Sequence, residues 1–98
     1  MLIMTGIEMI AKERQEQIEK HGRTLRADKA YNSQEVGGYF PLQCGTIYLL
    51  DQHFAHTPTH WDGKLLDKMK SKPYKERLII AGALIAAEID RLSDDKSV

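Results

Sequence analysis

Apolar residues recur at helical spacing in the first stretch of the chain, from residue 3 to about residue 20. When this stretch is drawn as a helix, its isoleucines share one stripe: Ile3, Ile7, Ile10 and Ile18. Arg14 interrupts that stripe, and Glu13 and Gln17 lie on its flank. Gly22 is typical of the residue that follows a helix. The pattern therefore predicts a first helix with a charged residue on its apolar face.

The middle of the chain is less regular. Asn32 and Glu35 have the spacing of a capping box, so a helix could begin there, although the two glycines that follow would weaken it. Pro41 fits the first turn of another helix, which we expect to reach about Phe54. Residues 56–63 have the composition of a loop.

The final apolar stretch predicts a helix from Tyr74 to about Leu92, preceded by a short helix at residues 65–69. One stripe of the last helix combines apolar residues with a carboxylate: Leu78, Ala81, Ile85, Glu88 and Leu92. The helix is apolar around most of its circumference and rich in small residues, which is typical of a central helix or of one in a subunit interface. We therefore expect a homo-oligomer, either a dimer or a tetramer.

No stretch alternates cleanly between apolar and polar residues, so no strand is expected. The predicted class is all-α: a small helical bundle formed by one domain over residues 1–98 and completed by homo-oligomerisation.

The composition of the chain argues against some classes of function. Lysine plus arginine equals aspartate plus glutamate, which argues against bulk nucleic-acid binding but allows a few cations to hold a small anion. The start of the chain lacks the features of a signal peptide, and no apolar run reaches the roughly 18 residues of a membrane span. With one cysteine, Cys44, an intrachain disulfide is impossible. These observations favour a cytoplasmic protein.

Glu88 needs a partner, because burying an unpaired carboxylate is costly. Arg77 lies on the same face of the last helix but is about 16 Å away along its axis, too far for an ion pair. Arg14 is the natural candidate from another helix. The plain interpretation is a buried Arg14–Glu88 ion pair. The functional interpretation is a polar pocket in which Glu88 holds a divalent cation and Arg14 holds a phosphate.

Other candidate groups each have a structural explanation beside the functional one. Glu13, Glu16 and Glu19 are spaced so that neighbours could share Mg²⁺, although only Glu13 lies near the apolar stripe and such faces are usually just solvated. Trp61 could stack on a nucleobase or fill the open end of the bundle. The cations near the start of the last helix could bind phosphates, or they could simply keep that end of the helix in contact with water. These cations are Lys72, Lys75 and Arg77.

Several segments together resemble a family of short proteins often carried by phages. They are IAKERQEQIEKHGRT, then Asp28 and Glu35, then IYLL, then WDG, and finally KPYKERLIIAGALIAAEIDRL. That family is related to the MazG-like all-α nucleotide pyrophosphohydrolases. The resemblance implies a helical, oligomeric protein that binds a nucleoside triphosphate with Mg²⁺ or Mn²⁺. It also implies cleavage between the α- and β-phosphates, which releases a nucleoside monophosphate and pyrophosphate.

The resemblance also implies roles for particular residues. It places the metal and the catalytic chemistry on three glutamates: Glu13, Glu35 and Glu88. It also implies that Asp28 is a further metal ligand. It places the nucleotide against residues of both long helices and of the segment between them: Arg14, Gln17, Trp61, Lys72 and Arg77.

A second hypothesis comes from the places where the chain departs from the family pattern. The family motif H-D-D-x-H is replaced here by residues 27–31, in which Lys29 stands where an acid is usual. Such changes favour a protein that keeps the pocket without the chemistry. It would sequester a nucleotide, such as a signalling nucleotide in phage–host conflict. A third hypothesis is an interaction protein in which Arg14 and Glu88 simply pair.

Overall fold

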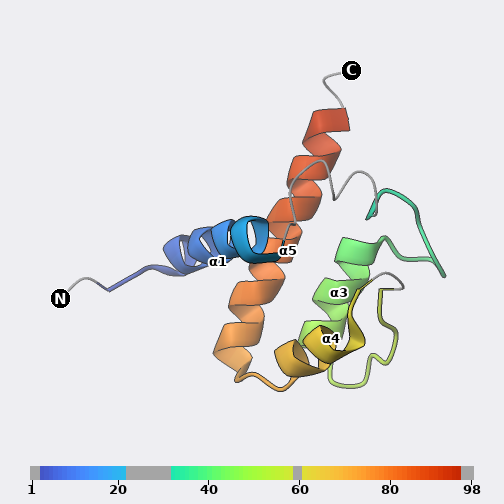
Figure 1. Ribbon diagram of the computed structural model, residues 1–98, viewed down its shortest axis with the longest axis horizontal. Helices are drawn as coiled ribbons and strands as arrows, with labels where there is room; N and C mark the ends of the chain where they lie inside the picture. Colours follow the sequence, from blue (N-terminus) through green and yellow to red (C-terminus); the bar gives the residue numbers. More distant parts are fainter. Residues whose placement is uncertain (1–2, 22–31, 59–60, 96–98) are drawn as a thin grey trace.

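Four helices account for most of the part of the chain that the structure describes. The computed structural model describes residues 3–21, 32–58 and 61–95 of the 98-residue protein. Figure 1 shows the helices and their labels: α1 (Gly6–His21), α3 (Pro41–Leu50), α4 (Gly63–Lys70) and α5 (Tyr74–Asp95). The described residues form no strand beyond one isolated bridge, which confirms the predicted all-α class.

Helix α1 begins three residues later than predicted because Thr5 caps it. Thr5 Oγ1 accepts a hydrogen bond from the Glu8 amide at 3.2 Å, and Glu8 Oε1 accepts one from the Thr5 amide at 3.0 Å. The predicted apolar stripe is wrong at its start, since Ile3 and Ile7 are 81% and 82% exposed. The predicted stop at Gly22 lies outside the described residues.

Residues 33–40 form a tight turn, so a helix opened by Asn32 and Glu35 is wrong. The amides of Val36 and Tyr39 each donate to the other's carbonyl, at 2.8 and 3.2 Å. The two residues between them, Gly37 and Gly38, have φ angles of 63° and 90°. This left-handed conformation suits glycine, and two such residues in sequence are typical of a two-residue hairpin turn. Gly37 and Gly38, which would weaken a helix, therefore form a turn instead.

Helix α3 ends at Leu50, before the predicted limit of Phe54, and cations from elsewhere in the chain bind its last carbonyl groups. Arg77 Nη1 donates to the Leu49 carbonyl at 2.9 Å. Lys70 Nζ donates to the carbonyls of Tyr48 and of Asp51, the latter at 3.0 Å. Cations at a helix C-terminus satisfy its free carbonyls and oppose the negative end of its dipole. Helices α4 and α5 thus stabilise the end of α3.

Helix α5 is the centre of the fold. It contacts both α1 and α3, which lie on either side of it in Figure 1. A Cβ atom on Gly82 would lie 2.6 Å from Ile10 Cδ1, so this glycine allows α1 to pack closely. The core is formed mainly by aliphatic residues of α3 and α5: Leu42, Leu49, Ile80, Ala81, Leu84 and Ala87.

The buried face of α5 is not the stripe that the sequence predicts. Ala81 is buried and Glu88 partly so, but Leu78, Ile85 and Leu92 are between 41% and 46% exposed. The helix instead turns another face to the core: Arg77, Ile80, Leu84, Ala87 and Arg91. Because α5 is apolar on most of its circumference, periodicity alone gives two possible inner faces, and packing against α3 selects one.

Within the described ranges, no helix is both long and apolar enough to cross a membrane. Cys44, on the inner side of α3, is 6% exposed and forms no disulfide. Its burial raises the pKa of the thiol above the usual 9.0, because a thiolate would be poorly solvated there. The cysteine therefore belongs to the packing of the bundle.

Candidate functional site

A pocket of about 200 Å³ lies between α1, α4 and α5, and we call it the Gln17 pocket. Its floor is apolar and its wall on α1 is polar. The lining residues come from all three helices and from Lys72 in the α4–α5 connection: Glu13, Glu16, Gln17, Lys20, Leu65, Lys68, Met69, Lys72, Ile80 and Leu84. Three residues that the sequence analysis assigned to a site thus meet here, namely Glu13, Gln17 and Lys72.

The α1 wall follows from helical spacing. Glu13, Gln17 and Lys20 lie four and then three residues apart, so their side chains share one face of the helix. Gln17 Nε2 donates to Glu13 Oε2 at 3.4 Å, which fixes the orientation of the amide. Glu16 also lines the pocket and is half-buried, although only Glu13 was expected to lie near the apolar stripe.

Gln17 is the polar group that defines the pocket. The residue is only 3% exposed, and its Oε1 atom is buried and accepts no hydrogen bond from any of the described residues. A buried acceptor without a donor costs about 1–3 kcal/mol. Since its amide nitrogen already donates to Glu13, the oxygen is the free end of the side chain. The pocket therefore offers a buried acceptor to an N–H or O–H group of a ligand.

Three lysines also line the pocket. Lys20 and Lys68 are exposed, and Lys72 is half-buried. Lys72 Nζ lies 3.8 Å from Glu76 Oε2, a solvent-exposed contact of the kind that contributes little to stability. Long side chains of this type can turn toward an anion at small cost. Lys20 and Lys68 were not among the predicted site residues, although the spacing of Lys20 from Gln17 could have placed it there.

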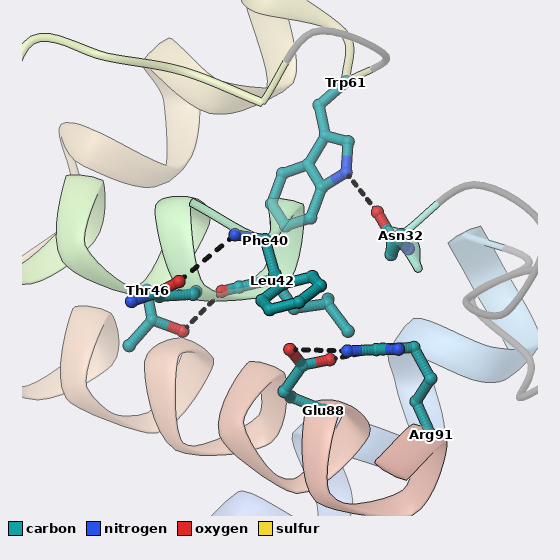
Figure 2. A network of polar contacts seen from close by, with 8 residues as sticks. Asn32, Phe40, Leu42, Thr46, Trp61, Glu88 and Arg91 are labelled. Atoms are coloured by element: carbon teal, nitrogen blue, oxygen red, sulfur yellow. Dashed lines mark hydrogen bonds and ion pairs between the residues drawn. The ribbon is translucent and has the colours of Figure 1, made fainter. Parts of the chain in front are cut away.

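Glu88 is paired with Arg91, its neighbour three residues later in α5. Arg91 Nε and Nη2 donate to the two carboxylate oxygens of Glu88 at 2.6 and 3.0 Å. Figure 2 shows this bidentate contact beneath the ring of Phe40, whose centroid is 5.1 Å from the guanidinium carbon. Arg91 is 3% exposed, so the pair is largely withdrawn from water. Arg91 was not among the predicted partners of Glu88, which were Arg77 of the same helix, rejected for its distance, and Arg14 of another helix.

The predicted Arg14–Glu88 ion pair is therefore wrong, because Glu88 binds Arg91 instead. Arg14 Nη2 lies 3.8 Å from Asp90 Oδ2, on the side of α5 that α1 covers. The side chain of Arg14 is 12% exposed and that of Asp90 is 59% exposed. Arg14 thus joins α1 to α5 through Asp90.

Trp61 and Arg77 hold positions in the frame of the bundle. Trp61 packs on α3, where a Cβ atom on Gly45 would come within 2.5 Å of the indole ring. Its Nε1 donates to Asn32 Oδ1 at 3.4 Å, as Figure 2 shows. Arg77 Nε donates to the Lys72 carbonyl at 3.1 Å, in addition to the contact with α3. Trp61 is thus packed against the core, whereas Arg77 is buried and binds backbone carbonyls instead of solvating the start of the last helix.

Of the remaining predicted ligands, Glu35 and Glu88 do not line the pocket. Glu35 is exposed beside the glycine turn, and Asp28 lies outside the described residues. Among the residues that the structure describes, no three acidic, histidine or cysteine side chains are arranged around one metal position. Glu13 and Glu16 nevertheless line the same pocket, and carboxylate oxygens are the ligands that Mg²⁺ and Mn²⁺ prefer. Glu13 and Glu16 alone supply fewer protein ligands than the three that such a group would need.

The fold and the site define an all-α protein with a small polar pocket at the junction of three helices. Comparisons of the chain with protein families, with curated proteins and with solved structures found no match.

Proposed function

We propose that the protein binds a nucleotide in the Gln17 pocket. The buried Oε1 atom of Gln17 carries this proposal, because it needs a hydrogen-bond donor that the described residues do not supply. Phosphate oxygens are acceptors, so Gln17 would instead receive an amino or imino group of the base, or a sugar hydroxyl. The phosphates would be bound by the lysines at the rim: Lys20, Lys68 and Lys72.

The size of the cavity is consistent with partial enclosure of such a ligand. Its volume of about 200 Å³ is below the roughly 300–1,000 Å³ of pockets that enclose a drug-sized ligand. One part of the nucleotide would enter the pocket while the rest lies across its rim. Exposed Lys20 and Lys68 suit that outer part, since they are free to follow a charged group.

For the activity, we propose metal-dependent pyrophosphohydrolysis of a nucleoside triphosphate. The resemblance in the first and last helices supports this reaction class, as does the placement of Glu13 and Glu16 on one wall of the pocket. These carboxylates would hold Mg²⁺ or Mn²⁺. When bound, such a metal neutralises phosphate charge and lowers the pKa of a bound water. Gln17 and the lysines would hold the nucleotide against this wall.

A second candidate is sequestration of a nucleotide without hydrolysis. The bidentate contact with Arg91 favours it, because both oxygens of Glu88 are already occupied by hydrogen bonds. Three lysines around one pocket can also bind phosphates without a metal. In this case the ligand would be released unchanged.

One incubation separates the two candidates. Near-stoichiometric protein is mixed with ribo- and deoxynucleoside triphosphates and cyclic nucleotides, with Mg²⁺ or Mn²⁺ or with a chelator. The filtrate and the denatured protein are then chromatographed. Nucleoside monophosphate and pyrophosphate in the filtrate would establish the hydrolase. A nucleotide depleted from the filtrate and recovered intact from the protein would establish sequestration. No change in either fraction would contradict both.

A Gln17→Leu variant tests the pocket itself. Loss of the buried acceptor should weaken binding of the retained nucleotide by about tenfold or more, the equivalent of roughly 1.4 kcal/mol. Gln15→Leu is the matched control, since Gln15 lies on the exposed side of the same helix and bonds to Glu19. Isothermal titration calorimetry measures both. Equal affinities for the two variants would contradict the assignment of the pocket.

A further inference from the structure

A second hollow adjoins the Gln17 pocket along α1, and we call it the Met9 hollow. Its volume is about 250 Å³, and its lining comes from the start of the chain, from α1 and from α5: Met4, Met9, Lys12, Glu13, Glu16 and Ile79. Glu13 and Glu16 line both spaces. Ile79 of the hollow is also next in sequence to Ile80 of the pocket. The two spaces therefore meet at the side chains of Glu13 and Glu16.

One face of α1 runs along both spaces. Four lining residues follow one another on it at intervals of four, three and four positions: Met9, Glu13, Glu16 and Lys20. Residues at these intervals are neighbours on the surface of a helix. At 1.5 Å per residue, the distance from Met9 to Lys20 along the helix axis is about 16 Å. The two spaces together therefore suit an elongated ligand that lies along α1.

The two ends of this groove differ in charge. Three lysines line the Gln17 pocket, so its cations outnumber the two shared carboxylates. The Met9 hollow has one cation, Lys12, beside the same two carboxylates, and its other lining residues are apolar. Phosphates therefore suit the Gln17 pocket. An uncharged aromatic ring suits the Met9 hollow, because methionine side chains adapt to its shape and make favourable sulfur–aromatic contacts.

Gln17 lies between these two ends. Phosphates bound by Lys20 would lie about one helical turn from Gln17, since the two residues are three positions apart. In a nucleotide, the sugar hydroxyls are the donors nearest the phosphates, whereas the amino and imino groups of the base lie at the far end. A sugar hydroxyl therefore matches the buried Oε1 atom of Gln17 better than a base does.

We infer that the nucleotide lies along α1 with its base in the Met9 hollow. Its phosphates would lie at the lysines of the Gln17 pocket, and a sugar hydroxyl would donate to Gln17 Oε1. This arrangement depends on the proposed nucleotide binding, and it adds a place for each part of the ligand. It also assigns a binding role to Met9, which no motif in the sequence indicates.

A Met9→Ser variant tests the position of the base. The probes are inorganic tripolyphosphate and whichever of ATP, GTP, CTP and UTP binds the wild type most tightly. Met9→Ser should weaken binding of that nucleotide by about three- to tenfold, because it removes a contact with the base, and should leave binding of tripolyphosphate unchanged. Ile7→Ser is the matched control on α1, since Ile7 is 82% exposed and lines neither space.

Isothermal titration calorimetry measures both probes, after circular dichroism has shown that each variant is folded. If the wild type binds a nucleotide and Met9→Ser binds it equally well, the inference is overturned while the proposed function stands. Equal losses for the nucleotide and for tripolyphosphate would also overturn it, because residue 9 would then not act on the base.

A dideoxynucleotide tests the contact with Gln17. Replacing the same nucleotide by its 2′,3′-dideoxy analogue should weaken binding to the wild type by about tenfold, because Gln17 Oε1 loses its donor. In Gln17→Leu the replacement should cost no further affinity, since the acceptor is already absent. If the wild type binds both forms equally while Gln17→Leu binds the parent nucleotide weakly, the donor belongs to the base. That result would overturn this arrangement and leave nucleotide binding in the Gln17 pocket intact.

Discussion

At the scale of single residues, the buried charges of the bundle are satisfied in different ways. Arg91 binds a carboxylate in its own helix, and Arg77 binds backbone carbonyl groups of α3 and of the α4–α5 connection. Arg14 lies beside a carboxylate of α5. The side-chain oxygen of Gln17 is also buried, and it accepts no hydrogen bond from the described residues. Because Gln17 in addition lines a pocket, that pocket is the candidate for ligand binding.

Glu88→Ala should destabilise the fold strongly, because it would remove both hydrogen bonds to the buried Arg91 guanidinium. Breaking one half of a buried pair costs roughly 3–5 kcal/mol. Glu88→Gln, which keeps one acceptor, should lose less. Chemical denaturation measures both, with Glu76→Ala as a control at an exposed carboxylate of the same helix. If Glu88→Ala were as stable as the control, the pair with Arg91 would not hold the bundle together.

The sequence identified some site residues and misassigned others for physical reasons. Glu13 and Gln17 could be predicted because they flank an apolar stripe, and Lys72 because it stands beside the start of a helix. Arg91 was not predicted as the partner of Glu88. A carboxylate in a helix can pair with a cation three residues away or with one from another helix, and only the packing of the helices decides between these partners. Nothing in the sequence shows that the Gln17 oxygen lacks a donor.

At the scale of the elements, the C-terminus of α3 depends on cations that come from α4 and α5. The last turn of α3 contains no basic residue of its own. Lys70 and Arg77 bind its final carbonyl groups, so the end of α3, the α4–α5 connection and the start of α5 form one unit.

Arg77→Met should lower the free energy of unfolding by about 1–3 kcal/mol. The substitution keeps an apolar stem of similar length but leaves the buried carbonyl of Leu49 without its donor. Lys75→Met is the matched control, because Lys75 is exposed two residues earlier in the same helix. Thermal denaturation followed by circular dichroism compares the two. A change no larger than that of the control would show that the cap contributes little.

The existence of the helices could be predicted from the sequence more readily than their limits. The periodic stretches in the first helix and in the last one are long enough to be unambiguous. The segment at residues 33–40 was misread because Asn32 and Glu35 fit a capping box, whereas the positive φ angles of the two glycines select a turn. Helix α1 begins at its Thr5 cap, and α3 ends where Lys70 and Arg77 bind its carbonyls.

At the scale of the whole molecule, α5 uses one face for both the core and the Gln17 pocket. Ile80 and Leu84 belong to the core cluster and also line the pocket, whereas Leu78, Ile85 and Leu92 are exposed. Periodicity predicted that this helix would be central or would lie in a subunit interface, but it could not say which apolar face would be buried, because several faces are equally apolar.

NMR can observe ligand binding at Gln17 directly. Protein labelled with ¹⁵N is titrated with ATP, GTP, CTP and UTP in turn, with and without Mg²⁺. We expect one of these nucleotides to shift the side-chain amide resonances of Gln17, together with backbone amides of its neighbours on α1 and α4. Shifts confined to residues outside the pocket, with the Gln17 side chain unchanged at saturation, would contradict this expectation.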